Sequence, residues 1–131
     1  MVIEEFEKIV EEAIERIPQK LRNQMSNVVI VIEDLPSREQ EKKLNLKGHT
    51  LFGLYEGIPL TKRGNHYAGV VPDKITIFKK SIERYARTEQ AVREQVFDTV
   101  WHEIAHHFGI SEEGIKNIKN NKNTYESKNI G

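Results

Sequence analysis

The sequence predicts an α+β domain in which two amphipathic helices pack on a small mixed sheet. Two stretches, residues 2–17 and 88–108, carry apolar residues at the three- and four-residue spacing of a helix that is buried along one side. Two others, residues 28–32 and 75–78, are too short for helices and are rich in β-branched residues. A chain of 131 residues is long enough for one domain around a single core.

The N-terminal stretch is the simpler of the two helices. Between its charged residues, the apolar ones recur on one side: Ile3, Phe6, Ile9, Val10, Ala13, Ile14 and Ile17. Pro18 lacks an amide hydrogen, so we expect it to end this helix or to open a short second turn. The unbroken apolar run of residues 28–32 predicts a strand that is buried on both faces, at the centre of the sheet. For the polar residues 36–47 we expect an irregular surface loop.

The middle of the chain is punctuated by glycines. Residues 51–55 predict a strand, and the glycine-rich stretch that follows allows only short, bent strands at the edge of the sheet or beside a cleft. Tyr55, His66 and Tyr67 lie in this region, and each has a ring and a polar group that could meet a substrate. Ordinary packing, with the polar group at the surface, is the simpler interpretation of each.

The segment before the second long helix predicts a turn, a strand and a helical turn in succession. Residues 72–74 predict the turn, residues 75–78 a largely buried strand, and residues 81–87 the short helical turn. Thr88 then suits the N-cap of the long helix, because its hydroxyl can accept a hydrogen bond from the first helical turn.

Near its C-terminal end, the second long helix contains the sequence HEIAH at residues 102–106. Histidines four residues apart lie on one side of a helix, roughly 40° apart in azimuth and about 6 Å apart along the axis. His102 and His106 can therefore bind one first-row metal ion. Glu103 flanks that position without occupying it, which suits a general base that takes a proton from a metal-activated water. Glu103 is our candidate for that catalytic base.

A glycine and two acidic residues extend this motif. Gly109 stands where a residue with positive φ would end the helix. The reversal that it permits can bring Glu112 back toward the two histidines as a third metal ligand, with Glu113 as the alternative. Two imidazoles and one carboxylate favour zinc and leave a fourth position open, although such ligands do not exclude manganese, iron or cobalt.

The two sides of this helix differ in composition. At 100° per residue, one side collects the apolar residues Val96, Phe97, Val100, Trp101, Ile104, Ala105 and Phe108. His102 and His106 fall on the opposite side, so one side can pack on a core while the other presents both imidazoles to a cleft. His107 falls among the apolar residues, and we expect it at the edge of the core or in support of the metal ligands.

The region from Leu51 to Glu113 resembles the small bacterial zincin-like metallopeptidases, also called minimal zincins. The similarity is carried by LFGLYEGIPLTKRG, PDKITIFKKSIERYA and REQVFDTVWHEIAHHFGISEE. The motif of that family, H-E-x-x-H-x-x-G-x-x-D, is matched by His102, Glu103, His106, Gly109 and Glu112, with glutamate in place of the final aspartate. The resemblance implies a zincin-like fold and zinc-dependent hydrolysis of a peptide or protein substrate.

Composition limits the possible partners, metal ligands and cellular location. Twenty basic and twenty acidic residues balance, so no net charge favours nucleic acid or an anionic membrane as a partner. The chain has no cysteine, so nitrogen and oxygen atoms must hold any metal. The acidic, amphipathic start lacks the basic and continuously apolar parts of a secretory signal, and we expect a cytoplasmic protein.

We assign residues 1–115 to a single domain and expect the asparagine- and lysine-rich residues 116–131 to form a flexible tail. The sequence is also compatible with two other functions. The first is a zincin-like protein that binds metal or a partner without catalysis. The second is a metal hydrolase with a non-peptide substrate, because the motif specifies a metal and a base but not the bond attacked.

Overall fold

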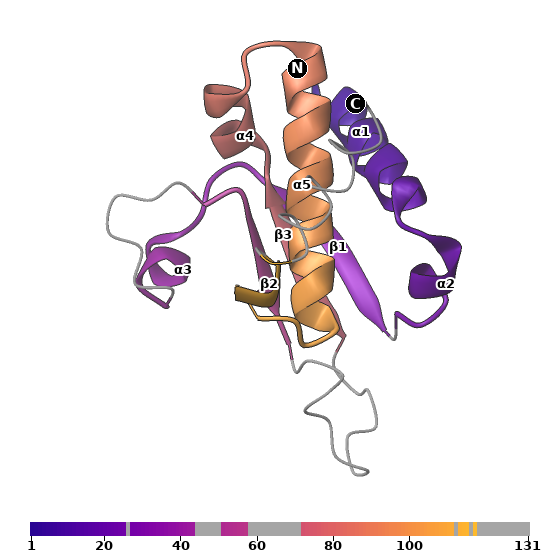
Figure 1. Cartoon of the computed structure of the whole chain (residues 1–131). Coiled ribbons are helices and arrows are strands. Elements are labelled where there is room, and N and C mark those ends of the chain that lie inside the picture. Colours follow the sequence, from indigo (N-terminus) through magenta and orange to yellow (C-terminus); the bar gives the residue numbers. More distant parts are fainter. Residues whose placement is uncertain (26, 44–50, 58–71, 112, 116, 118–131) are drawn as a thin grey trace.

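In the computed structural model of the chain, two long helices lie beside each other and share one core with a small sheet (Figure 1). The structure describes residues 1–25, 27–43, 51–57, 72–111, 113–115 and 117. Its elements are, in chain order, α1 (Ile3–Arg16), α2 (Gln19–Arg22), β1 (Val28–Glu33), α3 (Arg38–Lys43), β2 (Gly53–Glu56), β3 (Asp73–Phe78), α4 (Lys79–Tyr85) and α5 (Glu89–His107). The predicted α+β class is confirmed. Most of the expected tail, residues 116 and 118–131, lies outside the described residues.

The sheet formed by the described residues has the order β1-β3-β2 and is mixed, as predicted. Strand β1 runs parallel to β3, with Val28 opposite Asp73 and Glu33 opposite Phe78. Strand β2 runs antiparallel to β3, with Gly53 opposite Ile77. Strand β2 therefore stands at one edge of this sheet, where α5 contacts it.

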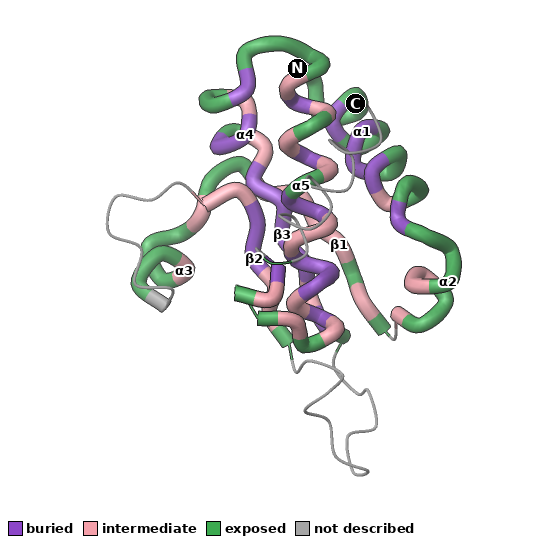
Figure 2. Tube along the Cα trace, in the orientation of Figure 1, coloured by how far each residue is buried: buried purple, intermediate pink, exposed green. Residues whose placement is uncertain are grey.

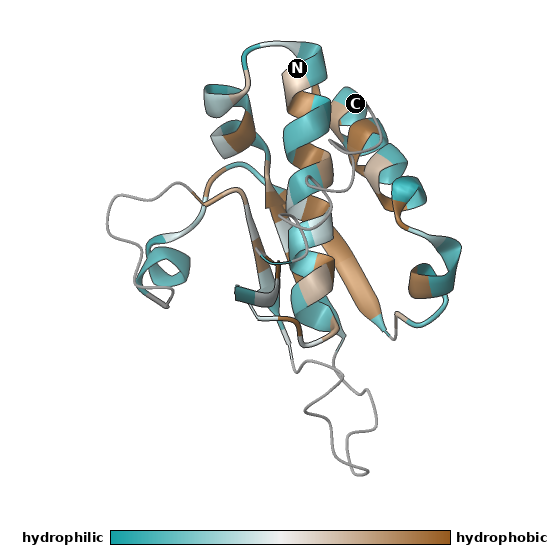
Figure 3. Cartoon of the chain, viewed as in Figure 1, coloured by the Kyte–Doolittle hydropathy of each residue, from teal (hydrophilic) through white to brown (hydrophobic). Residues whose placement is uncertain are grey.

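The prediction that residues 28–32 form the central strand is wrong. Among the described strands β1 lies at an edge, and Val29 within it is 42% exposed. Strand β3 occupies the centre although it contains polar residues. Figure 3 shows how hydrophobic β1 is despite this position. A hydrophobic run indicates that its side chains prefer burial. It does not indicate which strand has a hydrogen-bonded neighbour on both sides and is therefore central.

The core lies between the two long helices and the sheet. Its buried residues include Phe6, Ile9, Val10 and Ala13 of α1, Ile75 and Ile77 of β3, and Val92, Val96, Val100 and Ile104 of α5. Figure 2 shows buried residues gathering where α5 crosses the sheet. Both predicted helices are confirmed, and the Thr88 hydroxyl accepts a 3.0 Å hydrogen bond from the Ala91 amide as the N-cap of α5.

At the surface, Arg93 connects the two long helices. It pairs with Glu12 of α1 and, at 3.0 Å, with Glu89 of α5. The hydrogen bond to Glu89 and the charge of Glu12 raise the pKa of this exposed guanidinium above its usual value. Screening by water makes such exposed pairs weak, so the buried contacts hold α1 against α5.

Residues 36–47 were predicted as an irregular loop, but Arg38–Lys43 form helix α3. A reciprocal pair of hydrogen bonds begins this helix. The Gln40 amide donates to the Ser37 hydroxyl at 3.1 Å, and the Ser37 amide donates to the Gln40 side-chain oxygen at 2.7 Å. Serine followed three residues later by glutamine is the signature of a capping box, so the sequence did carry a signal for this helix.

Two smaller predictions also need correction. Asp73 and Lys74, predicted within a turn, are the first two residues of β3. The expected helical turn at residues 81–87 is the helix α4, which begins two residues earlier. In the parts of the chain that the structure describes, no helix is long and apolar enough to cross a membrane.

Candidate metal centre

The glycine at position 109 ends α5 as predicted. Its φ is 84°, a value that favours glycine. The Gly109 amide donates to the His106 carbonyl at 2.9 Å, and the Ile110 amide donates to the Ala105 carbonyl at 3.0 Å. These two bonds form a Schellman motif, which satisfies the last carbonyls of the helix and turns the chain back across its end.

The reversal also orients one of the two motif histidines. The Ile110 carbonyl lies 3.1 Å from His106 Nδ1 and can only accept a hydrogen bond, so Nδ1 carries the proton. This tautomer has its lone pair on Nε2, the nitrogen that would bind a metal. The His102 and His106 rings lie side by side with centroids 4.9 Å apart and planes at 75°. The two imidazoles are placed so that they could supply two nitrogen ligands to one metal ion.

The third ligand stays a prediction, because Glu112 lies outside the described residues. The alternative, Glu113, is exposed. Within the described ranges, no three histidine, aspartate or glutamate side chains form a group that could hold a metal. The neighbouring Ser111 caps the turn that follows, since its hydroxyl accepts a 3.1 Å hydrogen bond from the Gly114 amide.

Glu103, the candidate base, is buried beside the edge strand and is only 7% exposed. Strand β2 passes close to it at Gly53. A Cβ atom at position 53 would lie 3.3 Å from Glu103 Cγ and 2.5 Å from the Thr99 methyl group. Glycine is therefore required for α5 and β2 to approach this closely, and that approach holds the Glu103 side chain against the strand.

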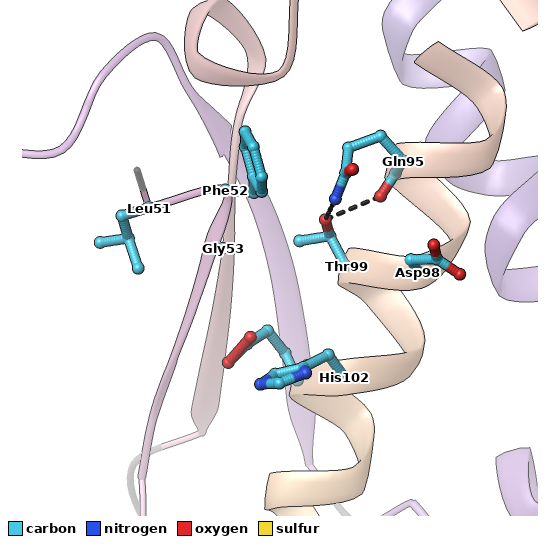
Figure 4. A pocket seen from close by; sticks show the side chains of 8 residues that line it. Leu51, Phe52, Gly53, Gln95, Asp98, Thr99 and His102 are labelled. Atoms are coloured by element: carbon cyan, nitrogen blue, oxygen red, sulfur yellow. Dashed lines mark hydrogen bonds between the residues drawn. The ribbon is translucent and has the colours of Figure 1, made fainter. Parts of the chain in front are cut away.

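A cleft of about 340 Å³ opens between α5 and β2 (Figure 4). Leu51, Phe52 and Gly53 line one wall, and Gln95, Asp98, Thr99, His102 and Glu103 line the other. Figure 4 shows the His102 ring directed from α5 toward the strand. Of the two imidazoles expected to face a cleft, His102 lines this one and His106 does not. The volume is within the range of small-molecule binding sites.

A buried polar cluster joins α5 to the sheet, and the sequence predicted it only in part. His107 is fully buried and bonds Asp73 Oδ2 at 2.8 Å, which agrees with a supporting histidine at the edge of the core. The Tyr55 hydroxyl was expected at the surface, but it donates to the same Asp73 oxygen at 2.6 Å. His66 and Tyr67 lie outside the described residues.

Asp73 is the residue that sequence reasoning missed. It is 1% exposed, yet the proline before it and the lysine after it favoured a turn at these three residues. Its partners His107 and Tyr55 are distant in the sequence, so no local pattern distinguished it from a turn residue.

The fold and the histidine pair define the class of the protein: a small α+β domain whose long helix carries an H-E-x-x-H motif beside a sheet-edge cleft. The sequence profile of the zincin-like metallopeptidases matches residues 25–121, and the chain belongs to this family. No curated protein matches the sequence.

The structure is similar to that of a conserved hypothetical protein from Thermus thermophilus. The TM-score is 0.55, and the match covers 82% of this chain and 94% of that chain at 23% identity. This likeness shows a shared fold. Together with the family match, it confirms the zincin-like resemblance read from the sequence.

Proposed function

We propose that the protein is a zinc-dependent peptidase in which Glu103 is the general base. The observation that carries the proposal is the position of Glu103, which is buried in the wall of the α5–β2 cleft and adjoins the first of two neighbouring imidazoles. A carboxylate held beside a metal position, but on a different side of the helix from the ligands, is suited to proton transfer.

In this proposal His102, His106 and Glu112 hold the zinc ion. When bound, zinc polarises the scissile carbonyl and makes a water molecule more acidic. The remaining steps belong to the chain itself. Glu103 accepts the proton of the attacking water and then delivers it to the leaving amine. The hydrogen bond between His106 and the Ile110 carbonyl keeps the ligand nitrogen directed away from the helix end.

The proposed substrate is an extended peptide. In the sheet formed by the described residues, β2 is an edge strand and contributes to one wall of the cleft, so a peptide segment can add to it by main-chain hydrogen bonds. In that position the peptide lies alongside β2 at the mouth of the cleft, and the bond to be cleaved lies near His102 and Glu103. Membership of the zincin-like metallopeptidase family supports the choice of a peptide over other substrates.

The test combines metal analysis of the purified protein with cleavage of a peptide library, with and without a chelator. We expect about one zinc per chain and cleavage that stops on chelation and returns when zinc is added. Stoichiometric zinc without cleavage of any peptide would instead identify a metal-binding protein. Cleavage that is unaffected by complete zinc removal would contradict the proposed mechanism.

A further inference from the structure

The side of α5 that faces the sheet carries three polar residues in a row. Thr99, Glu103 and His107 follow one another at four-residue intervals and are 5%, 7% and 0% exposed. A buried polar stripe is uncommon on the core side of a helix, because each polar group must be removed from water. Glu103, the proposed base, is the middle residue. The contacts that Thr99 and His107 make therefore determine how this part of α5 lies against the sheet.

His107 joins this stripe to the sheet. Its Nδ1 donates to Asp73 Oδ2, because a carboxylate oxygen is the acceptor in such a pair. The Tyr55 hydroxyl donates to the same oxygen. One carboxylate oxygen of Asp73 therefore connects α5 to the first residue of the central strand and to the edge strand that forms the wall of the cleft.

The backbone leaves this carboxylate little room to move. A Cβ atom at position 57 would lie 2.5 Å from both Cγ and Oδ1 of Asp73, so glycine is needed where the chain leaves β2. The Tyr55 ring also packs edge-on against the His107 ring, with centroids 5.9 Å apart. A fixed acceptor of this kind sets the direction of the hydrogen bond from His107, and hence the rotation of α5 about its axis.

We propose that Asp73 is a positioning residue that acts through His107 on the last turn of α5. That turn carries His106, and Glu103 lies one turn earlier on the same side as His107. Apolar packing could fill the same space but would tolerate small rotations, whereas two hydrogen bonds to one oxygen hold a single angle. A displacement of about 1 Å in a reacting group can lower turnover roughly 10²-fold. The inference rests on the proposed function, but it also predicts an effect on metal binding that needs no substrate.

Two substitutions at position 107 separate the hydrogen bond from the volume. The amide nitrogen of asparagine is as many bonds from Cβ as Nδ1 of histidine, whereas that of glutamine corresponds to Nε2. His107→Asn therefore keeps the donor to Asp73 and loses volume, and His107→Gln does the reverse. We expect His107→Gln to lower cobalt(II) affinity and kcat by about 10-fold or more with KM unchanged, and His107→Asn to stay within about threefold of the wild type.

Tyr55→Phe is the second variant, because it removes only one hydroxyl group. It should lower cobalt affinity and kcat in the same direction as His107→Gln but less. Thr76→Val is the matched control: Thr76 is also a buried polar residue of β3, yet its hydroxyl makes no hydrogen bond to Asp73 or His107. Its cobalt affinity and kcat should equal those of the wild type.

The two proposals fail separately. If the wild type cleaves no peptide, the hydrolase proposal fails, and cobalt affinities still decide the role of Asp73. If His107→Gln binds cobalt as well as His107→Asn or better, the positioning role is wrong even for an active peptidase. If His107→Gln does not fold, wild-type cobalt affinity in Tyr55→Phe overturns the positioning role, and a reduced affinity supports it.

Discussion

Helices α1 and α5 pack against each other, but only α5 also buries polar side chains. The buried residues of α1 are all apolar: Phe6, Ile9, Val10 and Ala13. Helix α5 buries Thr99, Glu103 and His107 in addition to its valines and isoleucine. Each polar group that is buried costs about 1–3 kcal/mol unless it is hydrogen-bonded. The difference indicates that α1 contributes only to stability, whereas α5 both packs on the core and carries the side chains of the proposed active site.

The largest expected effect is the loss of metal from α5. His106→Ala should abolish stoichiometric zinc binding, because one of the two proposed imidazole ligands is removed, and all cleavage should disappear with it. Metal content per folded chain is the measurement. A His106→Ala protein that binds one zinc with wild-type affinity would show that the helix pair is not the site.

The same measurement distinguishes the two acids. Glu112→Ala should weaken zinc binding more than Glu113→Ala, which is the matched control one residue away. The reverse order would assign the third ligand to Glu113.

The next effect concerns catalysis without metal loss. Glu103→Gln is nearly isosteric and leaves the ligands unchanged, so zinc content and melting temperature should be close to those of the wild type. Turnover should fall by about 10²–10⁴-fold, as expected for loss of a positioned proton-transfer group. Glu94→Gln, at an exposed position of the same helix, is the control and should keep full activity. Equal turnover in Glu103→Gln and the wild type would exclude Glu103 as the base.

Helix α1 should show the opposite behaviour. Phe6→Ala removes a fully buried aromatic side chain, which should lower the free energy of unfolding by about 3–5 kcal/mol. The protein that remains folded should keep its kcat, because α1 does not line the α5–β2 cleft. Ile3→Ala, at a position that is 40% exposed, should cost much less. A fall in kcat per folded molecule would mean that α1 is more than a packing element.

The smallest effect tests the contact between α5 and β2. Gly53→Ala places a methyl group against the Thr99 methyl and should cost about 1–3 kcal/mol, with lower kcat because Glu103 shifts. Thr99→Ser removes that threonine methyl but keeps the hydroxyl that bonds the Gln95 carbonyl. The double variant should therefore recover both stability and kcat. If it recovers neither, the close approach at Gly53 is not the cause.

Local chemistry made much of the candidate site predictable. The spacing of His102 and His106, the Thr88 cap and the stop at Gly109 each depend on residues within a few positions of one another, and the structure contains all three features. The burial of His107 followed from its place among the apolar residues of α5, because one helix fixes the direction of every side chain on it.

Contacts between distant segments were harder to predict. The order of the strands depends on which segments pair, and neither the hydrophobicity of β1 nor the polar residues of β3 contain that information. The bond between Asp73 and His107 joins residues 34 positions apart, so no local pattern marked Asp73 as buried. Helix α3 was missed for a different reason, since its capping box was present in the sequence and was outweighed by the charged composition around it.

The chain reversal at Gly109 links the proposed metal site to the end of the helix. The Ile110 carbonyl that orients His106 belongs to the same turn that closes α5. Helix ends open locally more readily than helix centres, and opening this end would break the hydrogen bond of His106 together with the two bonds of the glycine turn. An ion that binds only the closed end favours it by RT ln(1 + [L]/Kd). Metal binding should therefore reduce fraying of the last turn of α5, and fraying of that turn should weaken metal binding.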